Sequence, residues 1–408
     1  MTPQIKQRIE QIRRGEVPEG YKKTKLGIVP NEWEEIRFKN MFSRVTRKNK
    51  ENNDNVLTIS AQYGLINQRD FFNKDIASDD KSNYYLLENG EFAYNKSYSN
   101  GYPYGALKRL DMYDKGIVSP LYICFAANEE NKCPDFYIHY FEAGKMNREI
   151  QAFAQEGARN HGLLNISVDD FFNSNIVAPS LPEQEKIAEI LSAQDKLIAL
   201  KEKLLEEKRR QKKALMQQLL TGKKRLPGFS GEWKKYGFDQ IFNTISTQKY
   251  QISSEEYLEK AHYPVVDQGK KKIVAYSNNH EKVLKIPTGG VIVFGDHTRE
   301  VKYINFDFVI GADGTQVLKS KNDIASTTFL YYLLSNKTIV SDGYSRHFKY
   351  IKEFVYFVPN VGEQQTIVNI LSMIDREIEL IDKELDQEKQ RKKALMQLLL
   401  TGIVRVDI

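Results

Sequence analysis

Two segments of the chain carry apolar side chains at a seven-residue spacing, which is typical of long helices that pack against each other. In the first segment these positions are Leu191, Ile198, Leu205, Lys212 and Leu219, and in the second they are Leu371, Ile378, Leu385, Lys392 and Leu399. Four of the five positions are apolar in each segment. The pattern predicts two long helices that pair as a coiled coil with a polar centre.

Capping signals accompany both segments. A cap residue followed three positions later by a carboxylate predicts a helix N-terminus. This signal occurs at Ser180 with Glu183, Asn360 with Glu363, Ser192 with Asp195, and Ser372 with Asp375. Because the signal appears twice in each segment, we expect a short helix, a break and then a long helix. Gly222 and Gly402 suit the left-handed residue that ends a helix.

The regions between the helical segments have a different composition. Residues 33–179 and 233–359 are rich in Tyr, Phe, Asn and Gly and contain short apolar runs such as Val291–Phe294. Such runs predict strands, and a further strand is expected before each helical segment, at Ser174–Ala178 and Val355–Val358. We therefore expect two mixed α/β globules.

The chain is an internal repeat. Residues 183–222 match residues 363–402 with 21 identities in 40 positions, at an offset of 180. At an offset of 200, a second match pairs Trp33, Phe38, Phe42, Gly90 and Tyr94 with Trp233, Phe238, Phe242, Gly290 and Phe294. The change of offset means that the second copy lacks about 20 residues between Phe294 and Glu363.

The N-terminal residues Ile5–Gly15 have the pattern of the end of a repeated helix, which indicates a circularly permuted duplication. This arrangement favours antiparallel pairing of the two long helices, with the globules about 40 Å apart. That separation is close to one turn of B-DNA, roughly 34–36 Å. The expected division of the chain is an N-terminal partial repeat helix at 1–22, globules at 23–179 and 223–359, and helical spacers at 180–222 and 360–408.

Composition adds limits to this picture. The 408 residues are 41% hydrophobic and 28% charged, which indicates an ordered protein of several domains. No run of 18 apolar residues is present, so we expect no membrane partner. A polar N-terminus and only two cysteines favour a cytoplasmic protein. The net charge of +6 permits an anionic partner without requiring one.

Three repeated motifs carry a resemblance to a known family. They are a Trp after Pro-Asn-Glu at Pro30–Trp33, the P-x-L-P-E-Q-x-x-I pattern at Pro179–Ile187, and KKALMQQLLTG at Lys212–Gly222. Over essentially its whole length, the chain resembles the specificity (S) subunit of type I restriction-modification systems. It departs from the pattern where the second copy has Val361-Gly362 in place of Leu181-Pro182.

The resemblance implies a DNA-binding function without catalysis. In this family the globules are target recognition domains, and each recognises one half of a bipartite site in double-stranded DNA. The helices form the spacer and also bind two DNA adenine methyltransferase (M) subunits, and restriction (R) subunits complete the complex. The chain itself is then expected to hold no cofactor, because S-adenosylmethionine, ATP and Mg²⁺ belong to the partner subunits.

Candidate DNA contacts are cations, amides and hydroxyls on loops, because these groups bind phosphates and base edges. In the first globule they follow the predicted strand Gly90–Tyr94, and a second group lies nearer the helix. These residues are Asn95, Lys96, Tyr98, Asn100, Tyr102, Lys108, Arg109, Arg159, Asn160 and His161. Corresponding places in the second globule give Lys270, Lys271, His297, Thr298, Arg299, Lys302, Arg346, His347 and Lys349. The alternative for each residue is that it lies on an ordinary solvated loop or is a buried side chain with a structural role.

Other readings stay open at this point. A DNA-cleaving or DNA-modifying enzyme acting alone would need catalytic motifs, yet the chain has no P-loop. A nuclease PD…ExK pattern is matched only in part by Pro134, Asp135, Glu142 and Lys145, because the spacing from the glutamate to the lysine is one residue too long. Cys124, Cys133 and His139 lack the usual spacing of zinc ligands, which favours unpaired thiols. A coiled-coil scaffold without a nucleic-acid role is the third reading.

Two structural expectations complete the sequence picture. The apolar side chains Ile187, Ile190 and Leu191, like Ile367, Ile370 and Leu371 in the second copy, are either core or a docking face, and core is favoured. Residues 403–408 follow the last repeated motif, so we expect their removal to matter little.

Overall fold

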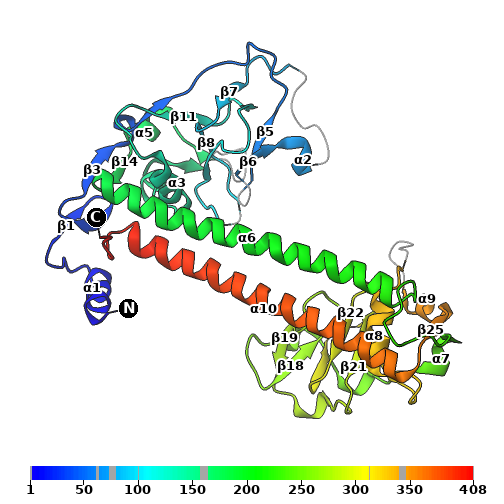
Figure 1. Ribbon diagram of the computed structural model, residues 1–408. Coiled ribbons are helices and arrows are strands. Elements are labelled where there is room, and N and C mark those ends of the chain that lie inside the picture. The colour runs from blue at the N-terminus through cyan, green and yellow to red at the C-terminus, as the bar shows by residue number, and fades with distance from the viewer. Residues whose placement is uncertain are drawn as a thin grey trace. The chain divides into compact units, whose positions relative to one another are not determined.

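A computed structural model of the chain describes residues 2–60, 64–72, 80–99, 101–156, 164–311, 313–339 and 346–407 (Figure 1). The chain divides into two units, Met1–Leu200 with Leu385–Ile408, and Lys201–Glu384. The long helices α6 (Leu181–Leu219) and α10 (Val361–Leu399) each contribute one part to each unit. Within the described ranges, no helix has the length and apolar character that crossing a membrane would require.

The first unit is built around a four-stranded antiparallel sheet in the order β4-β11-β8-β9, against which α3 packs. Phe38 stacks on Phe42 in its core, with ring centroids 4.6 Å apart. Its elements before α6 are α1 (Pro3–Arg13), β1 (Tyr21–Thr24), β2 (Gly27–Pro30), β3 (Glu34–Arg37), the 3-10 turn η1 (Phe38–Asn40), β4 (Phe42–Arg44), β5 (Leu57–Ser60), β6 (Gly64–Asn67), α2 (Gln68–Phe72), β7 (Tyr85–Glu88), β8 (Phe92–Asn95), β9 (Ala106–Arg109), β10 (Lys115–Val118), β11 (Ile123–Ala127), α3 (Pro134–Glu142), α4 (Asn147–Phe153), β12 (Gln155–Glu156), β13 (Leu164–Asn165), α5 (Val168–Asn173) and β14 (Asn175–Ala178).

The second unit has a four-stranded sheet in the matching order, β16-β24-β21-β22, and α8 packs against it. Phe238 stacks on Phe242, with ring centroids 4.8 Å apart. Its elements between the long helices are β15 (Lys234–Tyr236), α7 (Phe238–Ile241), β16 (Phe242–Ile245), η2 (Gln248–Tyr250), β17 (Gln251–Ile252), η3 (Ser254–Glu256), β18 (Tyr263–Val266), β19 (Ala275–Ser277), η4 (His280–Lys282), β20 (Val283–Leu284), β21 (Val291–Gly295), β22 (Val301–Ile304), β23 (Phe308–Gly311), β24 (Thr315–Ser320), α8 (Thr327–Ser335), α9 (Phe348–Glu353) and β25 (Tyr356–Val358).

These matching elements confirm the internal repeat and the mixed α/β class. Strands β4, β8, β9 and β11 correspond to β16, β21, β22 and β24, and α3 and α5 correspond to α8 and α9. The strands expected before the helical segments are present as β14 and β25. The N-terminal repeat fragment is also helical, because α1 ends before Gly15, which has a φ of +77° like the helix-ending Gly222 at +70° and Gly402 at +66°.

The expectation of a break inside each helical segment is wrong, because α6 and α10 are continuous helices of 39 residues. The second cap signal has another cause in each helix. Asp195 pairs with Lys392 at 2.5 Å, and Asp375 pairs with Lys212. The two aspartates therefore face the partner helix in place of capping a backbone end. The sequence signal is real, but it reflects pairing between helices.

The two long helices pair antiparallel within each unit, as the repeat predicts. In the second unit Lys201 pairs with Glu384 and Lys208 pairs with Glu377, each at 2.6 Å, so the partner number falls as the residue number rises. In the first unit Gln194 donates to the Glu388 carboxylate at 2.8 Å. The heptad positions Leu191, Leu205, Leu371 and Leu385 are buried. The polar heptad positions Lys212 and Lys392 pair with Asp375 and Asp195 of the opposite helix.

A buried glutamate anchors the start of each long helix to its unit. Glu183 is fully buried and accepts hydrogen bonds from Trp33 Nε1 at 2.8 Å and from Arg405 at 2.6 and 3.0 Å. In the second unit, Glu363 accepts from Trp233 at 3.3 Å and from Arg225 at 2.8 Å. Each arginine follows the end of the other long helix.

This anchor corrects the expectation that residues 403–408 matter little. Arg405 balances the buried charge of Glu183, and Val404 and Val406 pack against the core of the first unit. Arg8 also donates to the Ile403 carbonyl at 2.6 Å. The apolar helix residues Ile187, Leu191, Ile367 and Leu371 lie in the cores of their units, as favoured from the sequence.

Candidate nucleic-acid interface

In the first unit, the turn between β8 and β9 carries most of the predicted DNA contacts. The Asn95 side chain accepts a hydrogen bond from the Ser97 backbone at 3.1 Å, which fixes the start of the turn. Lys96 is half-buried, and burial lowers its pKa. Tyr98 is 62% exposed, so its ring is available for contact with a partner. Asn100 lies outside the described residues.

The second predicted segment of this unit begins and ends beside that turn. Arg159, Asn160 and His161 lie outside the described residues, but the strands that flank them, β12 and β13, pair antiparallel. The Leu164 backbone N–H donates to the Lys96 carbonyl at 3.1 Å. The chain therefore brings the flanks of the two predicted segments together, although they lie about 60 residues apart in the sequence.

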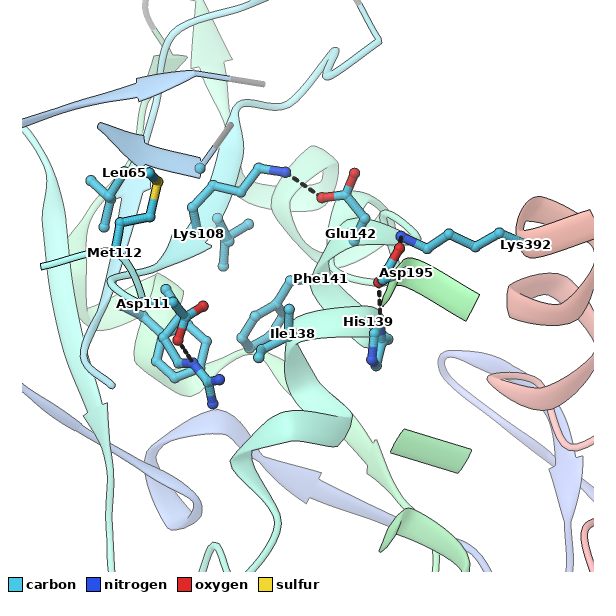
Figure 2. A pocket seen from close by; sticks show the side chains of 14 residues that line it. Leu65, Lys108, Asp111, Met112, Ile138, His139, Phe141, Glu142, Asp195 and Lys392 are labelled. Atoms are coloured by element: carbon cyan, nitrogen blue, oxygen red, sulfur yellow. Dashed lines mark hydrogen bonds and ion pairs between the residues drawn. The ribbon is translucent and has the colours of Figure 1, made fainter. Parts of the chain in front are cut away.

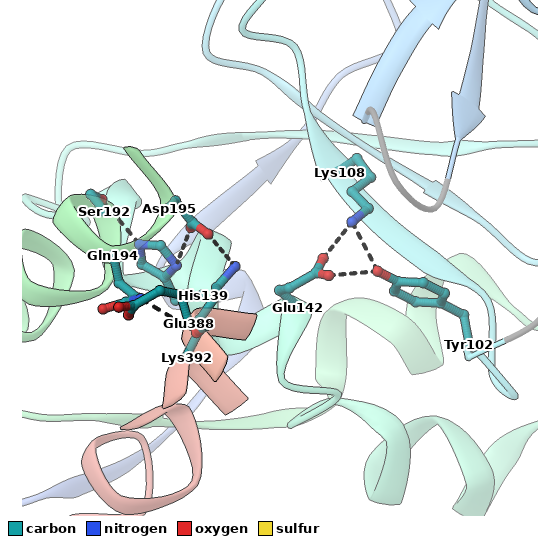
Figure 3. Close-up of polar contacts among 9 residues, drawn as sticks. All are labelled: Tyr102, Lys108, His139, Glu142, Ser192, Gln194, Asp195, Glu388 and Lys392. Carbon is teal, nitrogen blue, oxygen red and sulfur yellow. Dashed lines mark hydrogen bonds and ion pairs between the residues drawn. The ribbon is translucent and has the colours of Figure 1, made fainter. Parts of the chain in front are cut away.

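Three further predicted contacts are engaged in pairs within the unit. Tyr102 donates to the Glu142 carboxylate at 2.6 Å, and Lys108 pairs with the same carboxylate (Figure 3). Burial, together with the charge of Glu142, raises the pKa of Tyr102. Arg109 pairs with Asp111 and Asp135, each at 2.6 Å. The geometry thus assigns these three side chains to holding the turn against α3, which differs from the expected direct contact with DNA.

In the second unit, the turn between β21 and β22 is shaped by Gln268. Its side-chain amide oxygen accepts from the His297 backbone at 3.2 Å, and its amide nitrogen donates to the Asp313 carbonyl at 3.0 Å. The Thr298 hydroxyl donates to the Gln268 carbonyl. Arg299 has a φ of +66°, a left-handed conformation that points to a tight, constrained turn. In the sequence Gln268 begins the polar run that contains Lys270 and Lys271, and the fold brings it to this turn.

The segment before α9 packs against the same turn. The His347 backbone N–H and its Nδ1 both lie 2.9 Å from the Asp296 carbonyl, and the Phe348 N–H donates to the Asp296 carboxylate at 2.7 Å. Arg346 is exposed and forms an ion pair with Asp313 at 3.6 Å. Lys349 is exposed on α9 with its nitrogen over the Tyr350 ring.

Two of the predicted contacts in this unit are buried. His347 is 1% exposed, so its imidazole holds the turn and does not face solvent. Lys302 is 7% exposed and donates to the carbonyls of Asp267 at 2.8 Å and Lys271 at 2.6 Å. It therefore fixes the backbone that carries the exposed Lys270 and Lys271. For Lys302 and His347, the structure favours a supporting role over direct contact with DNA.

The two units thus bring together equivalent segments of different length. In each, the turn after the equivalent strand, β8 or β21, meets the segment before α5 or α9. The turn has 10 residues in the first unit (96–105) and five in the second (296–300). The connection that ends at α5 has 25 residues (143–167), and the one that ends at α9 has 12 (336–347). Most of the length missing from the second copy is lost at these two places.

Beside the first of these surfaces lies a cavity of about 280 Å³, in which charged side chains pair with one another (Figure 2). Lys108 pairs with Glu142, Arg109 with Asp111, and Lys392 with Asp195. Glu142 and Asp135, the two acids of the nuclease pattern, are both paired with cations of the same unit.

His139 joins α3 to the long helix α6 at the edge of this cavity. Its Nε2 lies 3.1 Å from the Ser192 hydroxyl, and its Nδ1 lies 3.7 Å from Asp195, which also pairs with Lys392 of α10 (Figure 3). Burial lowers the pKa of His139 to about 4, so the imidazole is neutral at physiological pH. Cys124 and Cys133 are buried free thiols. Among the described residues, no three His, Cys, Asp or Glu side chains are grouped to hold a metal ion.

Comparison with known proteins gives a consistent result. The family model described as the type I restriction modification DNA specificity domain matches twice, at residues 30–208 and 230–389. Similar curated proteins include two from Methanocaldococcus jannaschii. The putative type I restriction enzyme MjaX specificity subunit is 26% identical, with 95% of this chain and 97% of that protein covered. The type I restriction enzyme MjaVIII specificity subunit is 27% identical, with 72% and 75% covered.

Solved structures share the fold at low sequence identity. The S subunit of a type I restriction-modification system from M. genitalium has a TM-score of 0.58 and 16% identity, with 92% of this chain and 96% of that chain covered. A chain from a structure on the complex assembly and conformational transition of a type I restriction-modification system has a TM-score of 0.51 and 18% identity, with 92% and 99% covered.

Proposed function

Because the chain belongs to the type I restriction-modification DNA specificity family, we propose that it is the DNA-specificity subunit of a type I restriction-modification complex. In this role each unit recognises one half of a bipartite site in double-stranded DNA. The chain contributes binding and not catalysis, and its partner subunits carry S-adenosylmethionine, ATP and Mg²⁺. A DNA-cleaving or DNA-modifying enzyme acting alone is not supported.

One observation carries this proposal: the two units bring equivalent loop segments together, but the segments differ in sequence and length. The turn of 10 residues in the first unit contrasts with five in the second. A common scaffold with unlike loops is the arrangement expected of two domains that bind different sequences, since loops on a rigid scaffold carry specificity. The shared strands and helices give both units the same way of presenting these loops.

The side chains at these surfaces suit DNA. In the first unit Lys96 and Tyr98 follow the strand end, and in the second Thr298, Arg299 and Arg346 lie on the converging segments. Arginine and threonine bind base edges in the major groove, and lysine and arginine bind phosphates. The exposed Lys270 and Lys271 suit phosphate contacts, which contribute affinity without sequence preference.

The long helices suit the role of spacer. Each is continuous over 39 residues, which corresponds to roughly 58 Å. A continuous helix resists changes in length far better than a loop does. We propose that the paired helices fix the number of base pairs between the two half-sites.

The helices also suit the binding of partner subunits. Leu200 of α6 and Leu380 of α10, which correspond in the repeat, are 57% and 54% exposed, and Leu197, Leu204 and Met373 are exposed as well. Large apolar side chains on a polar helix surface mark sites of protein contact. We propose that these positions bind two methyltransferase subunits, to which restriction subunits are added.

Selection from a randomised DNA library tests the proposal. The chain, assembled with its methyltransferase, should select duplexes with two different short motifs separated by a constant number of base pairs. A chimaera in which residues 23–179 come from another family member should change one motif and leave the other unchanged. Selection of a single continuous motif, or a change in both motifs in the chimaera, would contradict the proposal.

A further inference from the structure

A second cavity of the first unit, of about 440 Å³, lies between the end of α3 and the second half of α10. Four lysines line it: Lys145, which follows α3, and Lys389, Lys392 and Lys393 on α10. Glu142 is the one acidic residue among its described lining residues. We call this site the lysine cavity.

The charges of the lysine cavity do not balance. Lys392 is paired with Asp195, and Glu142 is paired with Lys108 and Tyr102 (Figure 3). These pairs use the one carboxylate of the cavity. Neither Lys145 nor Lys393 forms an ion pair with any carboxylate in the described part of the chain. The cavity therefore presents at least two positive charges without protein counter-charges.

Lys145 gives a second reason to expect an anion. The residue is half-buried, and burial lowers the pKa of its amine to about 8. Burying a cation without a partner costs free energy, and an anion bound beside it would recover that cost. Glu142 shows that the environment tolerates negative charge. Burial raises the pKa of Glu142, but Lys108 and Tyr102 outweigh this effect and hold the pKa below its usual value.

The lining of the cavity also indicates which anion fits. Gly101 and Tyr102 belong to the turn between β8 and β9, which carries the candidate DNA contacts of this unit. A DNA strand whose bases lie against this turn would carry its backbone phosphates past the neighbouring surface. Phosphate contacts fix the position of a protein on the duplex without reading sequence.

We propose that the lysine cavity binds a phosphodiester group of the DNA backbone beside the half-site recognised by the first unit. This inference rests on the proposed function and extends it, because it places a DNA contact on a long helix. Lys145 and Lys393 supply the charge, and the paired Lys392 and Glu142 shape the cavity.

The internal repeat limits the inference to the first unit. Lys393 corresponds to Lys213 in α6, and Lys389 corresponds to Arg209. The correspondence of α3 with α8, however, places Thr338 where the first unit has Lys145. The half-buried lysine of the second unit, Lys337, instead donates to the Val355 carbonyl at 3.1 Å, so the phosphate contact is a difference between the two halves.

The salt dependence of DNA binding tests this proposal. The variants are Lys145→Met, which keeps the volume of the side chain, and Lys393→Gln, each in the full-length chain. With a duplex of arbitrary sequence as the probe, each loss of a phosphate contact should lower the slope of log affinity against log salt concentration by about 0.9. At about 0.1 M salt this corresponds to roughly eightfold weaker binding. Thermal unfolding checks that each variant is folded.

Lys186→Ala is the matched control, since it removes one positive charge from the same unit at an exposed position paired with Glu189. It should leave the slope unchanged. An unchanged slope in both Lys145→Met and Lys393→Gln, while the wild-type chain still selects two motifs, would overturn the lysine cavity and leave the proposed function intact. Loss of methyltransferase binding in place of DNA binding would also overturn it, because the anion would then belong to a protein. Failure of the wild-type complex to select any DNA would refute the proposed function itself.

A chemical measurement supplies an independent readout. An amine with a pKa of about 8 is acylated faster than an ordinary lysine at neutral pH, because more of it is uncharged. Acetylation of the wild-type chain should therefore modify Lys145 early, and bound duplex should protect it. Equal acetylation of Lys145 with and without duplex would contradict the proposal.

Discussion

At the level of single residues, burial separates the side chains proposed to contact DNA from those that support the loops. Lysine, arginine and histidine look alike in a sequence, but Lys302 and His347 are buried while Arg299 and Arg346 are exposed. Sequence patterns indicated the loops that the fold brings together in each unit, but not this division. The partners that decide it, such as Asp296 for His347, lie about 50 residues away in the chain. A pattern of neighbouring residues carries no information about such partners.

The buried Glu183 provides a prediction about stability. Glu183→Ala would leave the Trp33 N–H without its acceptor and would leave the partly exposed Arg405 with Glu32 as its remaining partner. We expect a loss of about 2–4 kcal/mol, because unsatisfied buried groups are costly. Chemical unfolding measures this change. Glu185→Ala, at an exposed position on the same helix, is the control and should cost less than about 0.5 kcal/mol; equal losses in the two variants would contradict the anchor.

The neutral His139 predicts loss of stability in acid. Its pKa is about 4 in the folded chain against an ordinary value of 6.5, so below pH 6.5 the unfolded chain binds the proton that the folded chain excludes. Stability attributable to this residue should be complete above pH 6.5 and fall as the pH drops toward 4, by roughly 2 kcal/mol at pH 5. Unfolding midpoints at pH 7 and pH 5 test this. In His139→Gln the fall should be smaller; an identical fall in variant and wild type would argue against a buried neutral imidazole.

At the level of elements, periodicity proved more reliable than local capping signals. The heptad pattern predicted both long helices, because a seven-residue spacing of apolar side chains extends along the whole helix-helix contact. The signals at Ser192 and Ser372 predicted breaks that do not exist, since Asp195 and Asp375 face lysines of the other helix. Likewise, the anchor between Glu183 and Arg405 spans 222 residues and leaves no local pattern.

Proline substitution tests the continuity of α10. Ser372→Pro would place proline inside the helix, where it removes a backbone hydrogen bond and should cost about 3 kcal/mol or more. Gly362→Pro, at the start of the same helix, copies the Pro182 of the first repeat and should be tolerated. Thermal unfolding and circular dichroism compare the two variants. If Ser372→Pro were as stable as Gly362→Pro, a break at Ser372 would be present after all.

At the level of the whole molecule, the sequence repeat predicted the pairing of the long helices better than it predicted the internal fold of the globules. Identities between the copies lie mainly in the helices, so their pairing could be foreseen. The strand order within each globule could not, because the pairing of strands far apart in sequence has no local signature. The shortening of the second copy is divided between the β21–β22 turn and the segment before α9, and these are the loops proposed to recognise DNA.

The central claim is that two unlike DNA-binding units are held at a separation set by the long helices. The most direct measurement is the gap between half-sites selected by a chain with seven residues inserted into each helix, after Leu200 in α6 and after Glu384 in α10. These points lie together, because Lys201 pairs with Glu384. The insertion adds about 10 Å, or roughly 3 base pairs. We predict that both motifs stay the same and that the gap lengthens by about this amount; a gap of unchanged length would contradict the account.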